Sequence, residues 1–296
     1  MQKAVALWLM AISLAGCSQS YSFGPAVADP PADLTHPASN FPFAIPVGSG
    51  AINAMMYTAS GDRPHPTVLL LHGFPGNEKN LDLAQAARRA GWNVLTMNYR
   101  GSWGSAGNFS FTGAAEDTRA ALSFLRDPGP VQRYHIDPTR IAIVGHSMGG
   151  MMAADAGADD RSVIGLFLID PWDISAVAKT IDTESGAKAW HEQMIANQRA
   201  LSGTDEATLA AELRNVGSQF DLAKRAGSYG NRPLDIIGAQ RGDGAANAVI
   251  LNAIQSSTNS SATGETWPTD HSFNDRRIRL SERLVQWLAK LPKHKE

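Results

Sequence analysis

The chain has almost no cysteine: Cys17 is the one such residue among 296. A single thiol excludes an intramolecular disulfide and metal sites built on cysteine ligands. Charge of either sign is also scarce, with a formal net charge of -2, a sequence pI of about 6.4 and no basic stripe. Nucleic acids and anionic membrane surfaces attract clustered lysine and arginine, so neither is indicated as a partner. Internal repeats are absent as well, which excludes a repeat array.

Residues 1–16 are typical of an export signal. A basic start is followed by an uncharged, mostly apolar run over residues 4–14, which is too short to span a bilayer comfortably. The Leu-Ala-Gly-Cys sequence at 14–17 resembles the lipobox of bacterial lipoproteins, in which the chain is cut before the cysteine and the new terminus is acylated. The resemblance implies that Cys17 anchors an exported protein to a bacterial membrane, with its domain in the periplasm or outside the cell. A plain secretory peptide with an incidental cysteine is the alternative.

The rest of the chain divides into a tether and one domain. Residues 17–41 are rich in Ser, Pro, Ala and Asp, and they predict a disordered tether. The remaining length of roughly 250 residues suits one α/β domain better than two small ones. We expect its core to comprise residues 42–170 and 233–296, interrupted by a helical cap over residues 171–232.

Strand-like and helical runs alternate through this core. Two short runs at 41–47 and 52–58 predict an antiparallel hairpin. Continuous apolar runs of strand length then alternate with stretches of helical spacing. The predicted strands are 67–71, 93–97, 141–144, 163–169 and 234–238, and the predicted helices are 81–90, 113–125, the stretch after 147, and 276–291. This pattern predicts an α/β fold with a mostly parallel, doubly wound sheet covered by helices on both faces.

The alternation stops between the sixth predicted strand and the seventh. Helical segments around 187–201, 206–216 and 220–226 replace it. Because this insertion leaves the carboxyl end of a strand, we expect it to lie over the crevice where open α/β sheets bind ligands.

The most informative motif is Gly-His-Ser-Met-Gly at 145–149. It follows an apolar strand and precedes a run of small residues that is suited to a helix. Glycines on both sides let the chain turn sharply, so that Ser147 is exposed above the sheet edge as a nucleophile. An ordinary glycine-rich turn is the alternative, but the strand and helix around the motif favour a nucleophile elbow.

A serine nucleophile needs a base and an acid that orients the base. Among the eight histidines we expect His271 to be the base, because it lies in a loop just before the last helix. The acid must lie between nucleophile and base in the chain. Asp243, in the turn after the strand at 234–238, fits best, and Asp170 and Asp173, after the strand ending at Ile169, are its rivals.

The tetrahedral intermediate also needs an oxyanion hole. Gly73 permits a tight turn after the strand at 67–71, so we expect the backbone N–H groups of Phe74 and Met148 to donate to one oxygen. No metal or organic cofactor is required. Bulky apolar side chains near strand ends are candidates for the substrate pocket. They are Phe74, Trp103, Phe109, Phe111 and Trp172.

These motifs together resemble the α/β-hydrolase superfamily, over roughly residues 42–290. The shared pattern comprises His72 with Gly73, the elbow at 145–149, and Asp-His-Ser-Phe at 270–273, in that order. The stretch 98–104, with Asp117 further on, is similar to the prolyl-oligopeptidase-like and dienelactone-hydrolase-like branches. No propeller domain precedes this region, however, and dienelactone hydrolases have cysteine as the nucleophile. Arg100 and Asp117 either bind a substrate carboxylate or pair with each other, and we favour the pairing.

The sequence therefore predicts an exported serine hydrolase that cleaves a small-molecule carboxylic ester, or an amide, through an acyl-enzyme. Esters are favoured over peptides. A peptidase or an acyltransferase on the same scaffold is one alternative, and a binding lipoprotein that has kept the fold without catalysis is another. A dehalogenase or epoxide hydrolase would need aspartate at position 147.

Overall fold

The computed structural model describes residues 24–48, 50–257 and 261–293. The predicted signal and Cys17 lie outside these residues, so export and lipid anchoring stay predictions from the sequence. Across the described residues, the structure contains no helix with both the length and the apolar character to cross a membrane.

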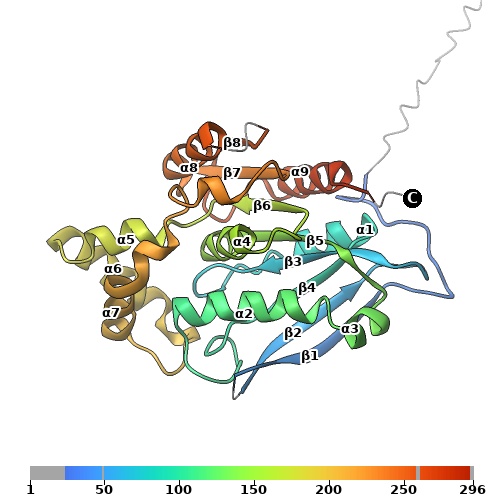
Figure 1. Cartoon of the computed structure of the whole chain (residues 1–296), viewed down its shortest axis with the longest axis horizontal. Coiled ribbons are helices and arrows are strands. Elements are labelled where there is room, and N and C mark those ends of the chain that lie inside the picture. The colour runs from blue at the N-terminus through green and yellow to red at the C-terminus, as the bar shows by residue number, and fades with distance from the viewer. Residues whose placement is uncertain (1–23, 49, 258–260, 294–296) are drawn as a thin grey trace, which may run out of the picture.

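An eight-stranded sheet forms the centre of the molecule (Figure 1). The strands are β1 (Ser39–Val47), β2 (Gly50–Thr58), β3 (His65–Leu71), β4 (Asn93–Met97), β5 (Ile136–His146), β6 (Gly165–Ile169), β7 (Leu234–Arg241) and β8 (Thr263–Asp270). Their order is β1-β2-β4-β3-β5-β6-β7-β8. The hairpin of β1 and β2 is antiparallel and β2 pairs antiparallel with β4, whereas β3 to β8 run parallel. The predicted fold class, a mostly parallel doubly wound sheet, is confirmed.

Helices cover both faces of the sheet and enclose two apolar cores. One core lies under α1 (Leu81–Arg89) and α9 (Arg277–Lys290), which also contact each other. The other lies under four helices, namely α2 (Phe111–Phe124), α3 (Pro128–Arg133), α4 (Met148–Asp159) and α8 (Gly244–Ser257). All five residues of β6 are buried, because helices cover both of its faces. This double coverage explains the continuous apolar runs in the sequence.

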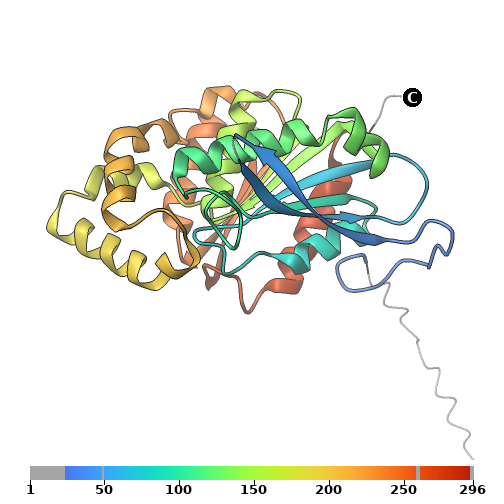
Figure 2. The same cartoon turned by 90° about the horizontal axis from the view of Figure 1, so that it is seen from below.

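The segment between β6 and β7, predicted as a cap, is helical and extends from one end of the molecule (Figures 1 and 2). It contains α5 (Ile174–Thr180), α6 (Glu184–Asn197) and α7 (Glu206–Val216), with 3-10 turns at 198–200, 217–220 and 226–228. Glu212 of α7 accepts hydrogen bonds from the backbone N–H groups of Phe111 and Thr112, at 2.9 and 2.8 Å. This carboxylate fixes the segment to the first turn of α2, where a helix presents free donors.

Several features differ from the sequence prediction. The helices α3, α5 and α8 and the strand β8 were not predicted. The segment at 220–226, predicted as helical, forms a turn between two short 3-10 turns. The edge strand β8 has one neighbour and a mostly polar sequence, so it gives little hydrophobic signal. The predicted tether is also not free along its whole length, because Arg89 of α1 donates to the carbonyl groups of Pro25 and Ala26, at 2.7 and 2.8 Å.

Candidate active site

The nucleophile elbow joins β5 to α4. Ser147 has φ 57° and ψ -125°, a strained conformation for a residue with a side chain. A Cβ at position 145 would lie 2.1 Å from the carbonyl oxygen of Gly149, and one at position 149 would lie 2.3 Å from that of Leu71. Both flanking positions therefore require glycine, which is the physical reason for the motif.

The turn after β3 lies against the side chain of Ser147. A Cβ at Gly73 would be 2.8 Å from Ser147 Cβ and 3.2 Å from its Oγ. The next residue in that turn is Phe74. Its backbone N–H and that of Met148, the first residue of α4, donate to no backbone carbonyl in the part of the chain that the structure describes. Two free backbone donors beside a serine hydroxyl suit an oxyanion hole, as the sequence analysis expected.

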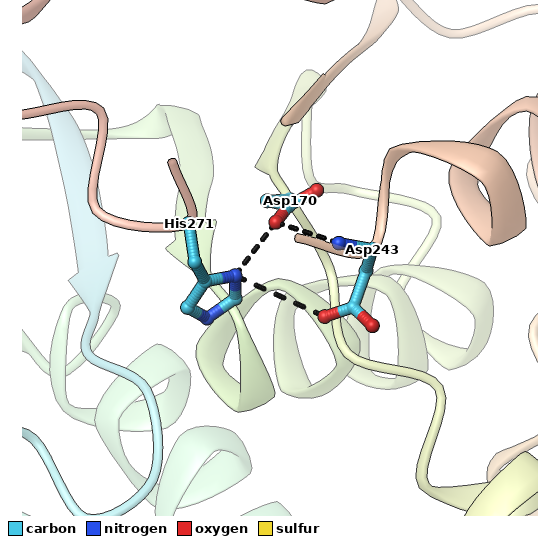
Figure 3. A group of neighbouring side chains, drawn as sticks. All are labelled: Asp170, Asp243 and His271. Carbon is cyan, nitrogen blue, oxygen red and sulfur yellow. Dashed lines mark hydrogen bonds and ion pairs between the residues drawn. The ribbon is translucent and has the colours of Figure 1, made fainter. Parts of the chain in front are cut away.

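Asp170, and not Asp243, makes the close contact with His271. His271 Nδ1 lies 2.6 Å from Asp170 Oδ2 and 3.9 Å from Asp243 Oδ2 (Figure 3). Only the first distance is that of a hydrogen bond. The sequence favours Asp243, with Asp170 as a rival, and the geometry reverses that preference. The chain turns after β7 so that the backbone N–H of Asp243 points at Asp170, at 3.0 Å, while its carboxylate stays at the rim.

Asp170 is fully buried and is held by several donors. Its Oδ1 accepts from the Ala239 N–H and from Asn247 Nδ2, both at 2.8 Å, and its Oδ2 accepts from Asp243 N–H and His271. A Cβ at Gly242 would lie 2.2 Å from Oδ2, so this approach also requires glycine. A buried carboxylate with this many donors is a fixed acceptor suited to orienting an imidazole.

Sequence reasoning missed Asn247 and Gly242. Asn247 lies in α8, a helix that was not predicted, so nothing in the sequence pointed to its amide. The Gly-Asp-Gly sequence at 242–244 indicates a functional turn, and the aspartate side chain is the group it suggests. In the structure it is the backbone N–H of Asp243 that contacts Asp170.

The electrostatics of the three side chains are linked. Burial disfavours the charged form of His271, but the hydrogen bond to Asp170 and the charges of Asp170, Asp243 and Asp270 outweigh it, so the pKa of His271 is raised above its ordinary value. Burial and the nearby charge of Asp170 raise the pKa of Asp243 to about 6, against the opposing effect of His271. The carboxyl group of Asp243, 3.9 Å from His271 Nδ1, therefore changes its own charge at a pH of about 6.

Ligand atoms of the same three side chains, Asp170, Asp243 and His271, lie within 4.8 Å of one another. Two carboxylates and an imidazole are a donor set that can hold a divalent cation. Both oxygens of Asp170 already accept two hydrogen bonds each, however. The set is therefore better suited to orienting an imidazole than to binding a metal.

Four of the five predicted pocket residues gather in one aromatic cluster. The ring of Phe74 lies 5.5 Å from Phe109, 5.8 Å from Phe111 and 5.9 Å from Trp172, between centroids. Trp190 of α6 joins them at 6.4 Å from Phe74, so the cap contributes to this cluster. Trp103 lies apart: it is 41% exposed, and its Nε1 donates to the Pro75 carbonyl at 2.7 Å.

The favoured pairing of Arg100 with Asp117 is present. Arg100 Nη2 lies 2.6 Å from Asp117 Oδ1, and the Arg100 backbone N–H donates to Asp117 Oδ2 at 2.7 Å. Because Asp117 is fully buried, this pair fixes Arg100 and the loop before α2, and it occupies the guanidinium that a substrate carboxylate would need.

Residues 68–286 match the model of the "Alpha/beta hydrolase family". "Uncharacterized protein YfhR" of Escherichia coli K12 is 30% identical over 115 residues, 38% of this chain and 39% of that one. A "Multifunctional-autoprocessing repeats-in-toxin" of Vibrio cholerae is 35% identical over 164 residues, 53% of this chain and 3% of the toxin. The chain thus spans less than half the length of these curated relatives.

Two solved structures share the fold over most of their length. The carboxylesterase EstE1, cloned from a metagenomic library, has a TM-score of 0.59 at 19% identity, covering 89% of this chain and 92% of that one. Est1E from Butyrivibrio proteoclasticus, in a structure with ferulic acid bound, has a TM-score of 0.66 at 16% identity, covering 84% and 98%. The family match runs from β3 to α9 and includes the elbow, Asp170 and His271, so this chain belongs to the alpha/beta hydrolase family.

Proposed function

We propose that this protein is a serine hydrolase that cleaves a carboxylic ester of a small molecule through an acyl-enzyme. The observation that carries the proposal is the 2.6 Å hydrogen bond between His271 Nδ1 and Asp170, in a chain whose nucleophile elbow has the strained serine and the two required glycines. Bonding Nδ1 to a carboxylate leaves Nε2 as the free nitrogen, which a general base needs.

The reaction follows from these groups. Ser147 Oγ attacks the ester carbonyl carbon and its proton passes to His271 Nε2, while the carbonyl oxygen becomes an oxyanion between the Phe74 and Met148 N–H groups. Asp170 stabilises the imidazolium. The tetrahedral intermediate then collapses and the bond between the carbonyl carbon and the alcohol oxygen breaks. The alcohol leaves with the proton from His271. Water then attacks the acyl-enzyme and gives a proton to His271. The bond between the acyl carbon and Ser147 Oγ breaks, the acid leaves, and the proton passes from His271 to Oγ.

The aromatic cluster around Phe74 supports an apolar acyl or aryl group on the substrate. The rings of Phe109, Phe111, Trp172 and Trp190 lie close to the residue that supplies one oxyanion donor. Three of these rings pack in the core and are at most 4% exposed, namely Phe109, Phe111 and Trp190. Phe74 and Trp172 are half-buried, so they are the two members of the cluster that can offer an apolar surface to a substrate. The names of the structurally similar EstE1, a carboxylesterase, and of Est1E with ferulic acid agree with an ester substrate.

The test uses the purified mature protein, a fluorophosphonate probe and a substrate panel. We expect the probe to label the peptide that contains Ser147, and p-nitrophenyl and aryl esters of graded acyl length to be hydrolysed faster than aminoacyl amides. Labelling located by mass spectrometry at another residue would overturn the assignment of the nucleophile. Amides cleaved faster than esters would make the protein a peptidase, and faster transfer to added alcohols than to water would make it an acyltransferase.

Ester hydrolysis should fall on the acid side with an apparent pKa above 6.5, the ordinary value for histidine. The base works only when His271 is neutral, and Asp170 and Asp243 favour its charged form, so the loss of activity begins at a higher pH than for a free imidazole. The pH profile of kcat/KM measures this value, which belongs to the linked groups together. An acid limb centred below 6.5 would contradict the contact that we describe.

A further inference from the structure

His146 occupies the variable position of the elbow motif and makes a contact that the reaction above does not use. Its Nε2 lies 2.8 Å from the backbone carbonyl oxygen of His271. A carbonyl oxygen only accepts, so Nε2 must carry the hydrogen. His146 Nδ1 is buried without a partner among the described residues, and the residue as a whole is 3% exposed. The ring is thus a neutral donor in a single tautomer.

This hydrogen bond joins the loop of the nucleophile to the loop of the base. His146 ends β5 and is covalently linked to Ser147, whereas His271 follows β8, at the far edge of the sheet. The two imidazole rings lie 4.7 Å apart between centroids, tilted by 39°. The acceptor is the backbone of the base residue itself, so this bond links His271 directly to the residue that precedes Ser147.

Other contacts hold the same loop at neighbouring points. Arg277 donates to the Ser272 carbonyl at 3.0 Å, and Asp270 Oδ1 accepts from the Asn274 N–H at 3.0 Å. The Arg277 contact ties the loop to α9, and the Asp270 contact joins two residues of the loop itself. His146 supplies the contact from the nucleophile side, which Arg277 and Asp270 do not reach.

The protonation state of His146 suits this task. Burial, and then the charge of His271, lower the pKa of His146 to about 3. The ring therefore stays neutral when His271 becomes positively charged during the reaction, and it donates its hydrogen bond without placing a second charge beside the imidazolium.

We propose that His146 is a positioning residue for His271, holding the backbone of the general base at a fixed distance from Ser147 through its Nε2–H. The proposal rests on the proposed function of Ser147 and His271, because a positioned base matters only if it acts. The variable residue of the elbow, His146, then contributes to catalysis by positioning the base.

The test compares His146→Leu, which keeps apolar volume and lacks the donor, with His146→Gln, which keeps an N–H donor. We expect His146→Leu to lower kcat per active site by about 10- to 100-fold with little change in KM, since a displacement of about 1 Å costs on this order. His146→Gln should recover a large part of the loss. The concentration of active sites is counted with the fluorophosphonate probe, so incomplete folding does not enter kcat.

The matched control is His65→Leu. His65 Nδ1 contacts the Gly91 carbonyl at 3.1 Å, another ring-to-backbone hydrogen bond, but at the opposite end of β3 from the elbow. This variant should lose thermal stability and keep kcat. The inference is overturned if His146→Leu has wild-type kcat, if the Leu and Gln variants lose activity equally, or if His65→Leu loses as much kcat as His146→Leu.

An NMR titration of the His271 imidazole gives a readout that needs no turnover. The groups that face His271 are the carboxylates of Asp170, Asp243 and Asp270 and the neutral ring of His146. Loosening the loop weakens the bond to Asp170, so the pKa of His271 should fall in His146→Leu and stay near the wild-type value in His65→Leu. An inactive wild-type protein that shows this shift would refute the proposed function, while the contact by which His146 holds the His271 loop would stand. An active wild-type protein in which His146→Leu leaves the pKa of His271 unchanged would refute the positioning role and leave the proposed function intact.

Discussion

Replacing Ser147 with alanine will abolish fluorophosphonate labelling and lower ester turnover by about 10⁶-fold, the cost of removing a serine nucleophile from a triad. The side chain is small and only 7% exposed, and the strained φ of 57° persists in the variant because the flanking glycines set the turn. The variant should therefore fold, bind substrate and fail at the chemical step. Burst kinetics and thermal unfolding of the same preparation measure both expectations.

The control for this change is Ser281→Ala. Ser281 is also a buried serine, but it lies in α9, away from the elbow. It should keep labelling and turnover at the wild-type level. Persistent probe labelling of Ser147→Ala, with the label on another residue, would show that the nucleophile is elsewhere, and equal losses in the two variants would point to unfolding in place of lost chemistry.

The sequence predicted the residues of the elbow and the base better than it predicted the acid, and the reason is physical. A nucleophile elbow is local: strand, glycine, serine, glycine and helix are contiguous in the chain, and steric exclusion at Gly145 and Gly149 fixes them. The identity of the acid depends on how two loops, after β6 and after β7, pass each other. Their relative placement is set by the turn at Gly242 and by the unpredicted helix α8, which brings Asn247 to Asp170. No local sequence pattern indicates how these two loops are placed relative to each other.

The same contrast explains the fold. Strands in the middle of the sheet, such as β4 and β6, are almost wholly buried and mainly apolar, with Asn93 and Thr96 as the polar residues of β4, and their positions were predicted closely. The strand β8, in contrast, buries only Trp267 and Thr269 fully, because it lies at the edge of the sheet. Its polar sequence follows from that exposure, and so the strand that delivers His271 to the site was interpreted as part of a loop.

Replacing Asp170 with asparagine will lower kcat by about 10⁴-fold, whereas Asp243→Asn will lower it by no more than about fivefold. Asparagine at 170 cannot accept the Nδ1–H as a carboxylate does, so the wrong tautomer of His271 is favoured and the imidazolium loses its counter-charge. Asp243 Oδ2 lies 3.9 Å from Nδ1, beyond hydrogen-bond distance, and its side chain is 34% exposed, so we expect this partly solvent-screened attraction to contribute no more than about 1 kcal/mol. Steady-state kinetics normalised to active sites measure both effects.

The pH profiles of these two variants separate the roles further. Both carboxylates raise the pKa of His271, so removing either charge should move the acid limb of kcat/KM to lower pH, with the larger shift for Asp170→Asn. In Asp243→Asn the group with a pKa of about 6 is also gone, so the limb should become a simple one-proton titration. If instead Asp243→Asn suffers the 10⁴-fold loss and Asp170→Asn a small one, the imidazole turns to Asp243 during the reaction, and the 2.6 Å contact describes a resting arrangement of the site.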